Sequence, residues 1–332
     1  SSDVCSSDLF TLPMAAHSPI LPSASAALCL VFAVILARQW WGRRRPYLLA
    51  WAIGMGWYGL ASGADAFGQL AGWSEATYRT WYLAGALMAA AWLGLGEVYL
   101  LRATGLGEVA AAGIFLGSVP AVVRGGRLLA AGEPAGMQAA LVVASIGIGT
   151  AIALGFVTWE WPSVSGHATA IALVLATAYV LVAVVTAPLD AGAMLDPATG
   201  VPQGAAMPDS VRILSPIFNV GGALMLVFGA VHSARAYLVE RANVERFASN
   251  VLIALGALTP SITGLLNRWG VTTAFYAGEF LGVLFIFAGF LASREVISRH
   301  GGPVFAALVR LPSKATTLKH TSLKREDPTR NG

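Results

Sequence analysis

The sequence predicts an all-α fold, a polytopic helical integral membrane protein with about nine transmembrane helices. Of its 332 residues, 56% are hydrophobic and only 11% are charged, and the mean hydropathy is +0.68. A soluble domain typically carries about 25% charged residues. Nine apolar segments account for most of the chain. Each is long enough to cross a bilayer, because a hydrocarbon core about 30 Å thick requires about 20 helical residues at a rise of 1.5 Å.

The nine segments follow one another through short connections, so no soluble domain is expected between them. They cover residues 20–40, 47–67, 80–101, 107–123, 137–157, 167–187, 213–234, 247–266 and 273–293. The first could be a cleaved signal peptide. No basic region precedes it, however, and Arg38 and Arg43 follow its apolar core. We therefore interpret it as the first membrane helix.

Small residues and prolines distinguish several of the later segments. Glycine pairs in the second, third, fifth and seventh segments would allow helices to approach closely; they are Gly54/Gly56, Gly94/Gly96, Gly147/Gly149 and Gly221/Gly222. The fourth segment contains Pro120 near its end, and the eighth contains Pro260 near its middle. Trp51, Trp57 and Trp92 lie deeper in their segments than an interfacial ring would, so they either line a cavity or fill the core.

Residues 14–300 are expected to form a single membrane domain. Residues 1–13 are expected to be non-native or disordered, because Asp3–Leu9 resembles a translated sequencing adapter. Residues 301–332 are expected to be a basic, disordered cytoplasmic tail, which holds all the lysines of the chain. The longest internal connector, 188–212, is rich in Gly, Ala, Pro and Asp.

The arginine distribution predicts the N-terminus outside and the C-terminus in the cytoplasm, and we expect the membrane to be a bacterial plasma membrane. Cytoplasmic loops carry an excess of basic residues. One side would hold Arg38, Arg43, Arg44, Arg45, Arg102, Arg235, Arg241, Arg246, Arg294 and Arg299, and the other Arg79, Arg124, Arg127, Arg212 and Arg268. Interfacial aromatic belts agree with this orientation. The inner belt would contain Trp40, Trp41, Trp159, Trp161 and Tyr237, and the outer belt Trp73, Tyr78, Trp81, Tyr82, Trp269 and Tyr276.

The first three and last three segments resemble each other and could form a parallel repeat. Leu28–Phe32 in the first matches Leu224–Phe228 in the seventh, and both segments end in Ala-Arg. The third segment begins with Trp81-Tyr82-Leu83-Ala84-Gly85, and the ninth begins with the similar sequence Phe275-Tyr276-Ala277-Gly278. Repeats of this kind occur in transporters, which bind their substrates at the repeat interface. Leu, Ala, Gly and Phe are abundant in this chain, so chance similarity is the alternative.

An inner set of polar residues would lie near the cytoplasmic face. It consists of Glu97, His167 and His232, with Glu160 in a nearby loop. A carboxylate and two imidazoles could relay protons, hold a metal ion or, through the histidines, ligate a haem. Alternatively, these helix-end groups reach interfacial water.

An outer set comprises Asp65, Asn219, Asn267, Arg268 and Glu279. Glu279 is the most embedded carboxylate, and Arg268 is its expected partner because an unpaired charge at that depth would neutralise. The pair could simply hold two helices together, or it could contact a solute. Pro260 lies inside the eighth segment and removes one backbone hydrogen-bond donor. Membrane helices interrupted by proline in this way often form the binding sites of transporters. We expect a substrate site formed by Glu279, Arg268, Asn219, Asp65, Pro260, Trp57 and Trp92.

The motifs that are missing restrict the function. The chain has no HExxH, GxSxG, Walker A or GxGxxG sequence, and no membrane lysine that could hold retinal. No catalytic motif, no cofactor and no nucleic-acid partner are therefore expected. The leading hypothesis is a small-solute transporter or permease in the lipid bilayer. The alternatives are a membrane-embedded ligand sensor or accessory subunit, with a protein partner or as a homo-oligomer, and an intramembrane enzyme or haem/metal protein that uses Glu97, His167 and His232.

Overall fold

The computed structural model describes residues 18–101, 106–197, 199–240, 244–268 and 273–292, and all their regular elements are helices. The all-α prediction is therefore confirmed. Predicted segments 1–13 and 301–332 lie outside these ranges. The elements are α1 (Ile20–Arg43), α2 (Pro46–Ala71), α3 (Glu75–Trp81), η1 (Tyr82–Met88), α4 (Ala89–Leu100), α5 (Leu106–Ala130), α6 (Pro134–Glu160), α7 (Ser165–Thr186), η3 (Ala191–Ala193), η4 (Gly204–Ala206), α8 (Asp209–Arg212), α9 (Ser215–Glu240), α10 (Val244–Arg268) and α11 (Thr273–Ala292).

Each predicted apolar segment coincides with a long helix, the third being α3, η1 and α4 in continuous succession. Within the described ranges, seven of these helices are long and apolar enough to span a membrane. The protein is therefore a multi-pass membrane protein. The other two long helices, α2 and α10, carry more polar and small residues. α2 holds Asp65 and Gln69, and only Val251–Pro260 of α10 is strongly apolar.

Local sequence signals account for the ends of several helices. α1 stops at Arg44, which adopts a left-handed conformation (φ 52°) and donates its N–H to the carbonyl of Trp40. Pro46 opens α2 and Pro134 opens α6, positions where proline loses no helical hydrogen bond. Ser74 caps α3 by accepting the N–H of Thr77 at 3.2 Å. These signals place the turns where the chain reverses direction.

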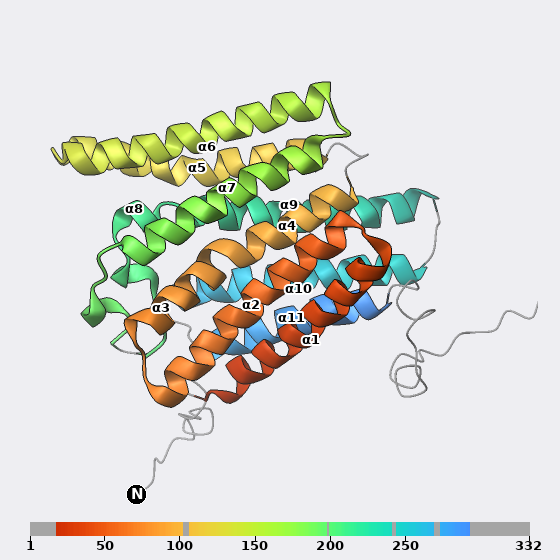
Figure 1. Cartoon of the computed structure of the whole chain (residues 1–332), viewed down its shortest axis with the longest axis horizontal. Coiled ribbons are helices and arrows are strands. Elements are labelled where there is room, and N and C mark those ends of the chain that lie inside the picture. The colour runs from red at the N-terminus through yellow and green to blue at the C-terminus, as the bar shows by residue number, and fades with distance from the viewer. Residues whose placement is uncertain (1–17, 102–105, 198, 241–243, 269–272, 293–332) are drawn as a thin grey trace, which may run out of the picture.

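Six helices form a closed ring. α1 packs on α2, α2 on α4, α4 on α9, α9 on α10, α10 on α11, and α11 returns to α1. The ring therefore consists of the first three and the last three predicted segments. The long helices run back and forth along one common direction (Figure 1). Outside the ring, α5 and α6 form a hairpin that attaches to it through α5 and α9, and α7 makes sparser contacts with α4, α5 and α6.

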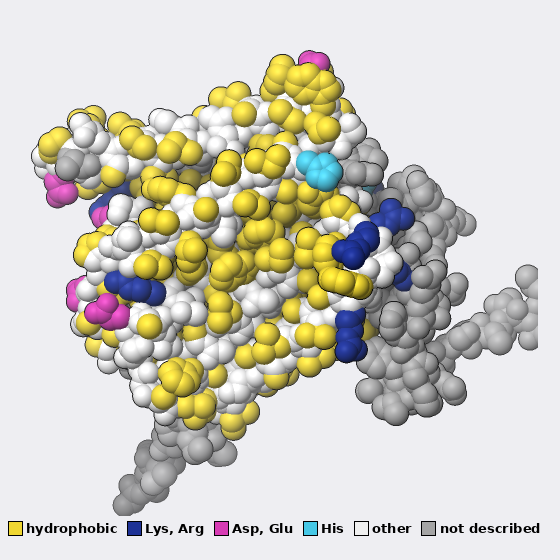
Figure 2. Space-filling view, in the orientation of Figure 1, with side chains coloured by type: hydrophobic (Ala, Val, Ile, Leu, Met, Phe, Trp, Pro, Cys, Tyr) yellow, Lys and Arg dark blue, Asp and Glu magenta, His cyan; other side chains and the backbone are white. Residues whose placement is uncertain are grey.

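The surface agrees with insertion in a bilayer. Hydrophobic side chains cover most of the face seen in Figure 2, whereas charged side chains gather at the two ends of the helices. Arginines lie at the end where α1 turns into α2, and acidic side chains with a further basic group lie at the opposite end. Large apolar residues on α7, such as Leu175 and Val182, are 66% and 61% exposed, as expected for side chains that face lipid.

The connector between α7 and α9 is folded rather than open. It contains η3, η4, α8 and an isolated bridge between Leu195 and Pro202. Val201, Ala206 and Met207 of this connector are almost fully buried. We call residues 187–214 the cap, because they cover the ends of α3 and α7 at the predicted outer face. Sequence composition alone had indicated only a long connector.

Candidate functional site

The predicted outer aromatic belt is in part a buried cluster beneath the cap. Tyr78 and Tyr82 are only 0% and 3% exposed and stack at 6.3 Å between ring centroids. The hydroxyl of Tyr78 donates to the carbonyl of Gln203 in the cap. The belt prediction was wrong for these two residues, because interfacial and core aromatics cannot be distinguished until the covering segment is placed.

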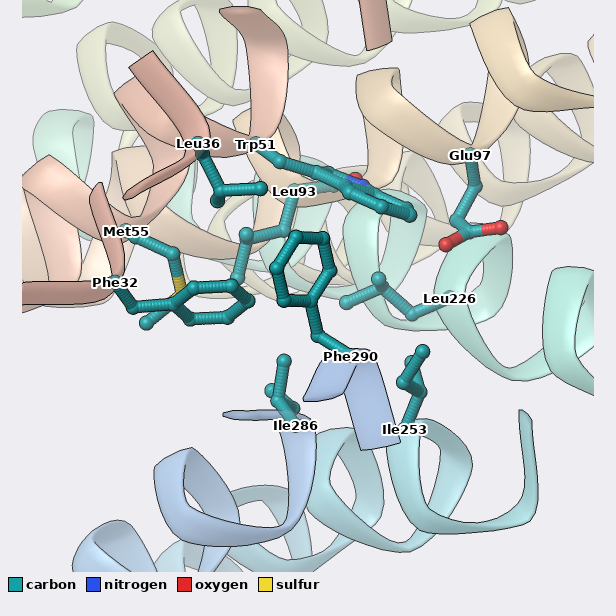
Figure 3. Close-up of a pocket in the computed structure, with 10 residues that line it drawn as sticks. All are labelled: Phe32, Leu36, Trp51, Met55, Leu93, Glu97, Leu226, Ile253, Ile286 and Phe290. Carbon is teal, nitrogen blue, oxygen red and sulfur yellow. The ribbon is translucent and has the colours of Figure 1, made fainter. Parts of the chain in front are cut away.

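The axis of the six-helix ring contains a small cavity of about 20 Å³. All six helices supply its lining: Phe32 and Leu36 from α1, Trp51 and Met55 from α2, Leu93 and Glu97 from α4, Leu226 from α9, Ile253 from α10, and Ile286 and Phe290 from α11. Figure 3 shows the rings of Phe32, Trp51 and Phe290 grouped on one side and Glu97 beyond Leu226. Phe32 and Phe290 lie 4.9 Å apart between ring centroids, so the axis is closed by apolar side chains at this level.

Glu97 is the single charged residue of this lining and is only 4% exposed. Its carboxylate reaches toward α9, where a Cβ on Gly229 would lie 2.5 Å from Oε2, so glycine makes room for it. Among the described residues, none donates a side-chain hydrogen bond to this carboxylate or forms an ion pair with it. A buried carboxyl without a partner is costly when ionised, so this site favours a neutral acid.

The other members of the inner set lie on the surface. His167 is exposed, and its Nδ1 lies 3.2 Å from the hydroxyl of Tyr99. His232 is exposed on α9. In the part of the chain that the structure describes, no group of three or more His, Cys, Asp or Glu could hold a metal ion. The structure therefore does not gather Glu97, His167 and His232 into one metal centre.

A second polar cluster lies between α1, α2 and α11, on the side of the ring nearer the cap. Asp65 is 1% exposed, and its Oδ1 accepts hydrogen bonds from Gln69 at 2.9 Å and from the Tyr276 hydroxyl at 3.5 Å. One turn along α11 from Tyr276, the backbone carbonyl of Glu279 accepts the hydroxyl of Tyr58 at 3.2 Å. The structure thus brings together two residues of the predicted site, Asp65 and Glu279, from segments far apart in the sequence.

Arg268, the expected partner of Glu279, has its side chain outside the described part of the structure. It is the last residue of α10, and the side chain of the preceding Asn267 lies outside the described part as well. The Glu279–Arg268 pair stays a prediction.

Pro260 lies inside one continuous helix, α10, rather than at a break. The hydroxyl of Thr259 bonds the carbonyl of Leu255 at 2.7 Å, and that of Thr263 bonds the carbonyl of Thr259 at 3.0 Å. The ring of Pro260 contacts α11 at Gly282, where an added Cβ would lie 2.6 Å from Cγ. Its visible role is helix packing, because the missing backbone donor does not interrupt the helix.

Asn219 is engaged in holding a π-helical segment. Its amide donates to the carbonyl of Ala86 at 2.7 Å and to the hydroxyl of Ser215 at 3.0 Å, and Ser215 also donates to Ala86. Ala86 lies in η1, where the π-helical turn leaves a carbonyl available to a neighbouring helix. Neither the π-helix nor this role of Asn219 had a clear sequence signal.

The two predicted tryptophans occupy different environments. Trp92 donates to the Thr177 hydroxyl at 3.3 Å and thereby joins α4 to α7. Trp57 packs against the core that contains Tyr78, and its buried Nε1 has no partner among the described residues. Neither lines the small cavity on the ring axis or the larger cavity between α5, α6, α7 and α9.

The larger cavity was missed by sequence reasoning. It has a volume of about 440 Å³ and lies between α5, α6, α7 and α9, outside the ring. We call it the lateral slot. Its wall on α7 extends from Thr169 to Val180, roughly 17 Å at 1.5 Å per residue. Ile146 and Leu175 at its edge are 64% and 66% exposed, so the slot opens at the lipid-facing surface.

No protein-family profile, curated protein or solved structure matches the chain. The functional assignment therefore depends on the geometry of the molecule.

Proposed function

We propose that the protein is a small-solute transporter or permease in a bacterial plasma membrane, with the N-terminus outside and the six-helix ring as its translocation unit. The observation that carries this proposal is the ring axis. Glu97 lines the cavity on this axis beside the packed rings of Phe32 and Phe290, and Asp65 and Glu279 lie in a second polar cluster nearer the cap, joined through Tyr276 of α11. Ionisable residues inside a membrane usually face a bundle interior and mark substrate or ion pathways.

The order of helices in the ring supports the predicted repeat. If the first segment corresponds to the seventh, the second to the eighth and the third to the ninth, then each contact within one half has a counterpart in the other. The α4–α9 contact would correspond to the α11–α1 contact. A two-fold relation of this kind along the membrane normal occurs in transporters, whose sites lie between the two halves.

The test of transport is uptake by proteoliposomes. A labelled panel of small amines, alcohols and monocarboxylic acids is offered to the wild type and to Glu279→Gln, with Glu75→Gln as the matched control. Glu75 is an exposed carboxylate near the same membrane face. We expect protein-dependent uptake that Glu279→Gln abolishes and Glu75→Gln preserves. Uptake by Glu279→Gln at the wild-type rate would remove Glu279 from the pathway.

The lateral slot favours a second candidate function, a membrane-embedded ligand sensor or accessory subunit. Its lining is almost entirely apolar, with Thr150, Thr169 and Tyr179 as the main polar groups. A narrow apolar molecule, such as a single acyl chain, could enter from the bilayer between α6 and α7. Binding to the folded state would stabilise it by RT ln(1 + [L]/Kd), about 2.7 kcal/mol at 100 times Kd.

This second candidate is tested by thermal unfolding with dodecanoic acid as the probe. Ala176→Phe places a ring in the slot, whereas Val174→Phe places the same ring on the lipid-facing side of α7, where Val174 is 52% exposed and does not line the slot. We expect the probe to stabilise the wild type and Val174→Phe but not Ala176→Phe. Stabilisation that is equal in all three proteins would place the probe elsewhere. Binding in the slot without protein-dependent uptake would favour the sensor over the transporter.

A further inference from the structure

The cluster around Asp65 contains more hydrogen-bond acceptors than donors. Asp65 Oδ2 and Gln69 Oε1 are both buried and have no partner among the described residues, although Asp65 Oδ1 has two. Ser25 Oγ, on the neighbouring helix α1, is likewise buried and unpartnered within the described structure. Carbonyl and ionised carboxylate oxygens only accept hydrogen bonds. A buried acceptor left without a donor is destabilising, so this site favours the binding of an electropositive species.

Like charges meet in the same cluster. The Tyr276 hydroxyl bonds Asp65, and Glu279 follows Tyr276 by one turn of α11, where its carbonyl accepts the Tyr58 hydroxyl. Cys29 of α1 packs at Gly59, beside Tyr58, so Tyr58, Cys29 and Tyr276 are the other titratable groups of this cluster. None of these groups becomes a cation. Two carboxylates in one poorly hydrated site cannot both remain ionised, because each disfavours the charged form of the other. A single proton removes one of the two charges and turns one acceptor into a donor.

A third acid, Glu97 of α4, lies in the cavity that α2 and α11 line further along their length. Tyr58 contacts Glu279, and Met55 and Trp51 of α2 line the cavity that holds Glu97. On α11, Ile286 lines that cavity and lies seven residues, roughly 10 Å, beyond Glu279. Met55 on α2 and Val283 on α11 lie between these levels and are 0% exposed, and together with Phe32 they belong to one buried apolar cluster, which we call the apolar layer.

We propose that Asp65 and Glu279 form a proton-binding pair within the membrane, that Glu97 is a second proton-binding site on the opposite side of the apolar layer, and that the coupling ion of the protein is therefore the proton. This inference deepens the proposed transport function by naming its coupling ion. The presence of the bound protons does not depend on the solute. A proton would pass between the two sites only when the ring rearranges and admits water to the layer of Phe32, Met55 and Val283.

The protonated acids are tested by infrared spectroscopy of purified protein in lipid. A protonated carboxyl absorbs in a region separate from that of a carboxylate. We expect the wild type at neutral pH to show this band and to lose it when the pH is raised. The double substitution Asp65→Asn/Glu279→Gln should remove one part of the band and Glu97→Gln the remainder. Glu75→Gln, in an exposed carboxylate near the same face as the pair, should leave it unchanged.

The absence of this band in wild-type protein at neutral pH would overturn the proposal, and this measurement needs no variant to fold. Persistence of the full band in the triple variant would overturn it as well. If the bands behave as expected but no solute is taken up, the proton sites stand and the transport assignment fails. If uptake occurs and the band is absent, transport stands and the coupling ion is not the proton.

Discussion

Single polar side chains join helices that are distant in the sequence, and Arg79 is the clearest case. Its guanidinium donates to the carbonyls of Val184 and Ala187, at the C-terminal end of α7. The last carbonyls of a helix have no partner within it and carry a partial negative charge, so a cation is favoured there. Arg79 thus fixes α7, which otherwise makes sparse contacts, to α3 and hence to the ring.

Arg79→Gln is expected to lower the free energy of unfolding by about 2–3 kcal/mol, because two hydrogen bonds from a charged donor are lost. The measurement is thermal or denaturant unfolding of detergent-purified protein. Arg127→Gln serves as the control, since Arg127 is exposed near the same membrane face. Unfolding of Arg79→Gln at the wild-type midpoint would mean that the cap and not Arg79 holds α7.

At the scale of elements, glycine decides how closely helices approach. Two glycines mark the contact between α10 and α11. A Cβ added to Gly256 would lie 2.6 Å from the carbonyl oxygen of Gly282, and a Cβ added to Gly278 would lie 2.3 Å from the side chain of Thr263. Between α4 and α9, a Cβ on Gly222 would lie 2.3 Å from the backbone of Ala90. Small residues allow this approach, and packing is the main source of helix association in lipid.

Gly282→Ala should separate α10 from α11 and destabilise the protein by about 1–3 kcal/mol, the usual cost of overpacking. Gly149→Ala is the matched control in α6, because its Cβ would meet nothing within 4 Å. The two variants are compared by unfolding in the same detergent. Equal stability of both would show that α11 can shift without cost.

At the scale of the whole molecule, the long helices run back and forth along one direction, so their turns gather at two opposite ends that would lie at the two faces of the membrane (Figure 1). The cap and the α5–α6 turn lie at one end, and the α1–α2 and α6–α7 turns lie at the other. The arginine excess predicts that the second end is cytoplasmic. If this orientation is right, the proton-binding pair lies nearer the outside and Glu97 nearer the inside.

The orientation is checked by cysteine accessibility in a background that lacks Cys5 and Cys29. Single cysteines at Ala131 and Ala191 should react with an impermeant maleimide in intact cells. Single cysteines at Gly42 and Ser163 should react only after permeabilisation. All four positions are exposed in loops or at helix ends. The reverse pattern would invert the orientation without changing the fold.

Sequence alone determined the class of the protein and the course of its chain. Long apolar segments must form helices in a bilayer, because backbone groups there can be satisfied only internally. In the described ranges each predicted segment coincides with a long helix, and seven of these helices are apolar enough to span a membrane. Sequence also singled out Asp65, Glu97 and Glu279, because a carboxyl within an apolar span is rare enough to stand out.

Only the tertiary structure decided which helices meet. Lipid-facing and core-facing apolar side chains look alike in sequence, so the six-helix ring, the lateral slot and the folded cap carried no local signal. The same holds for Asp65 and Glu279, which lie on α2 and α11 and share a site because the ring closes between α11 and α1. The grouping of Asp65 with Tyr276 and Glu279 is a consequence of long-range packing, which depends on the whole set of contacts rather than on any single segment.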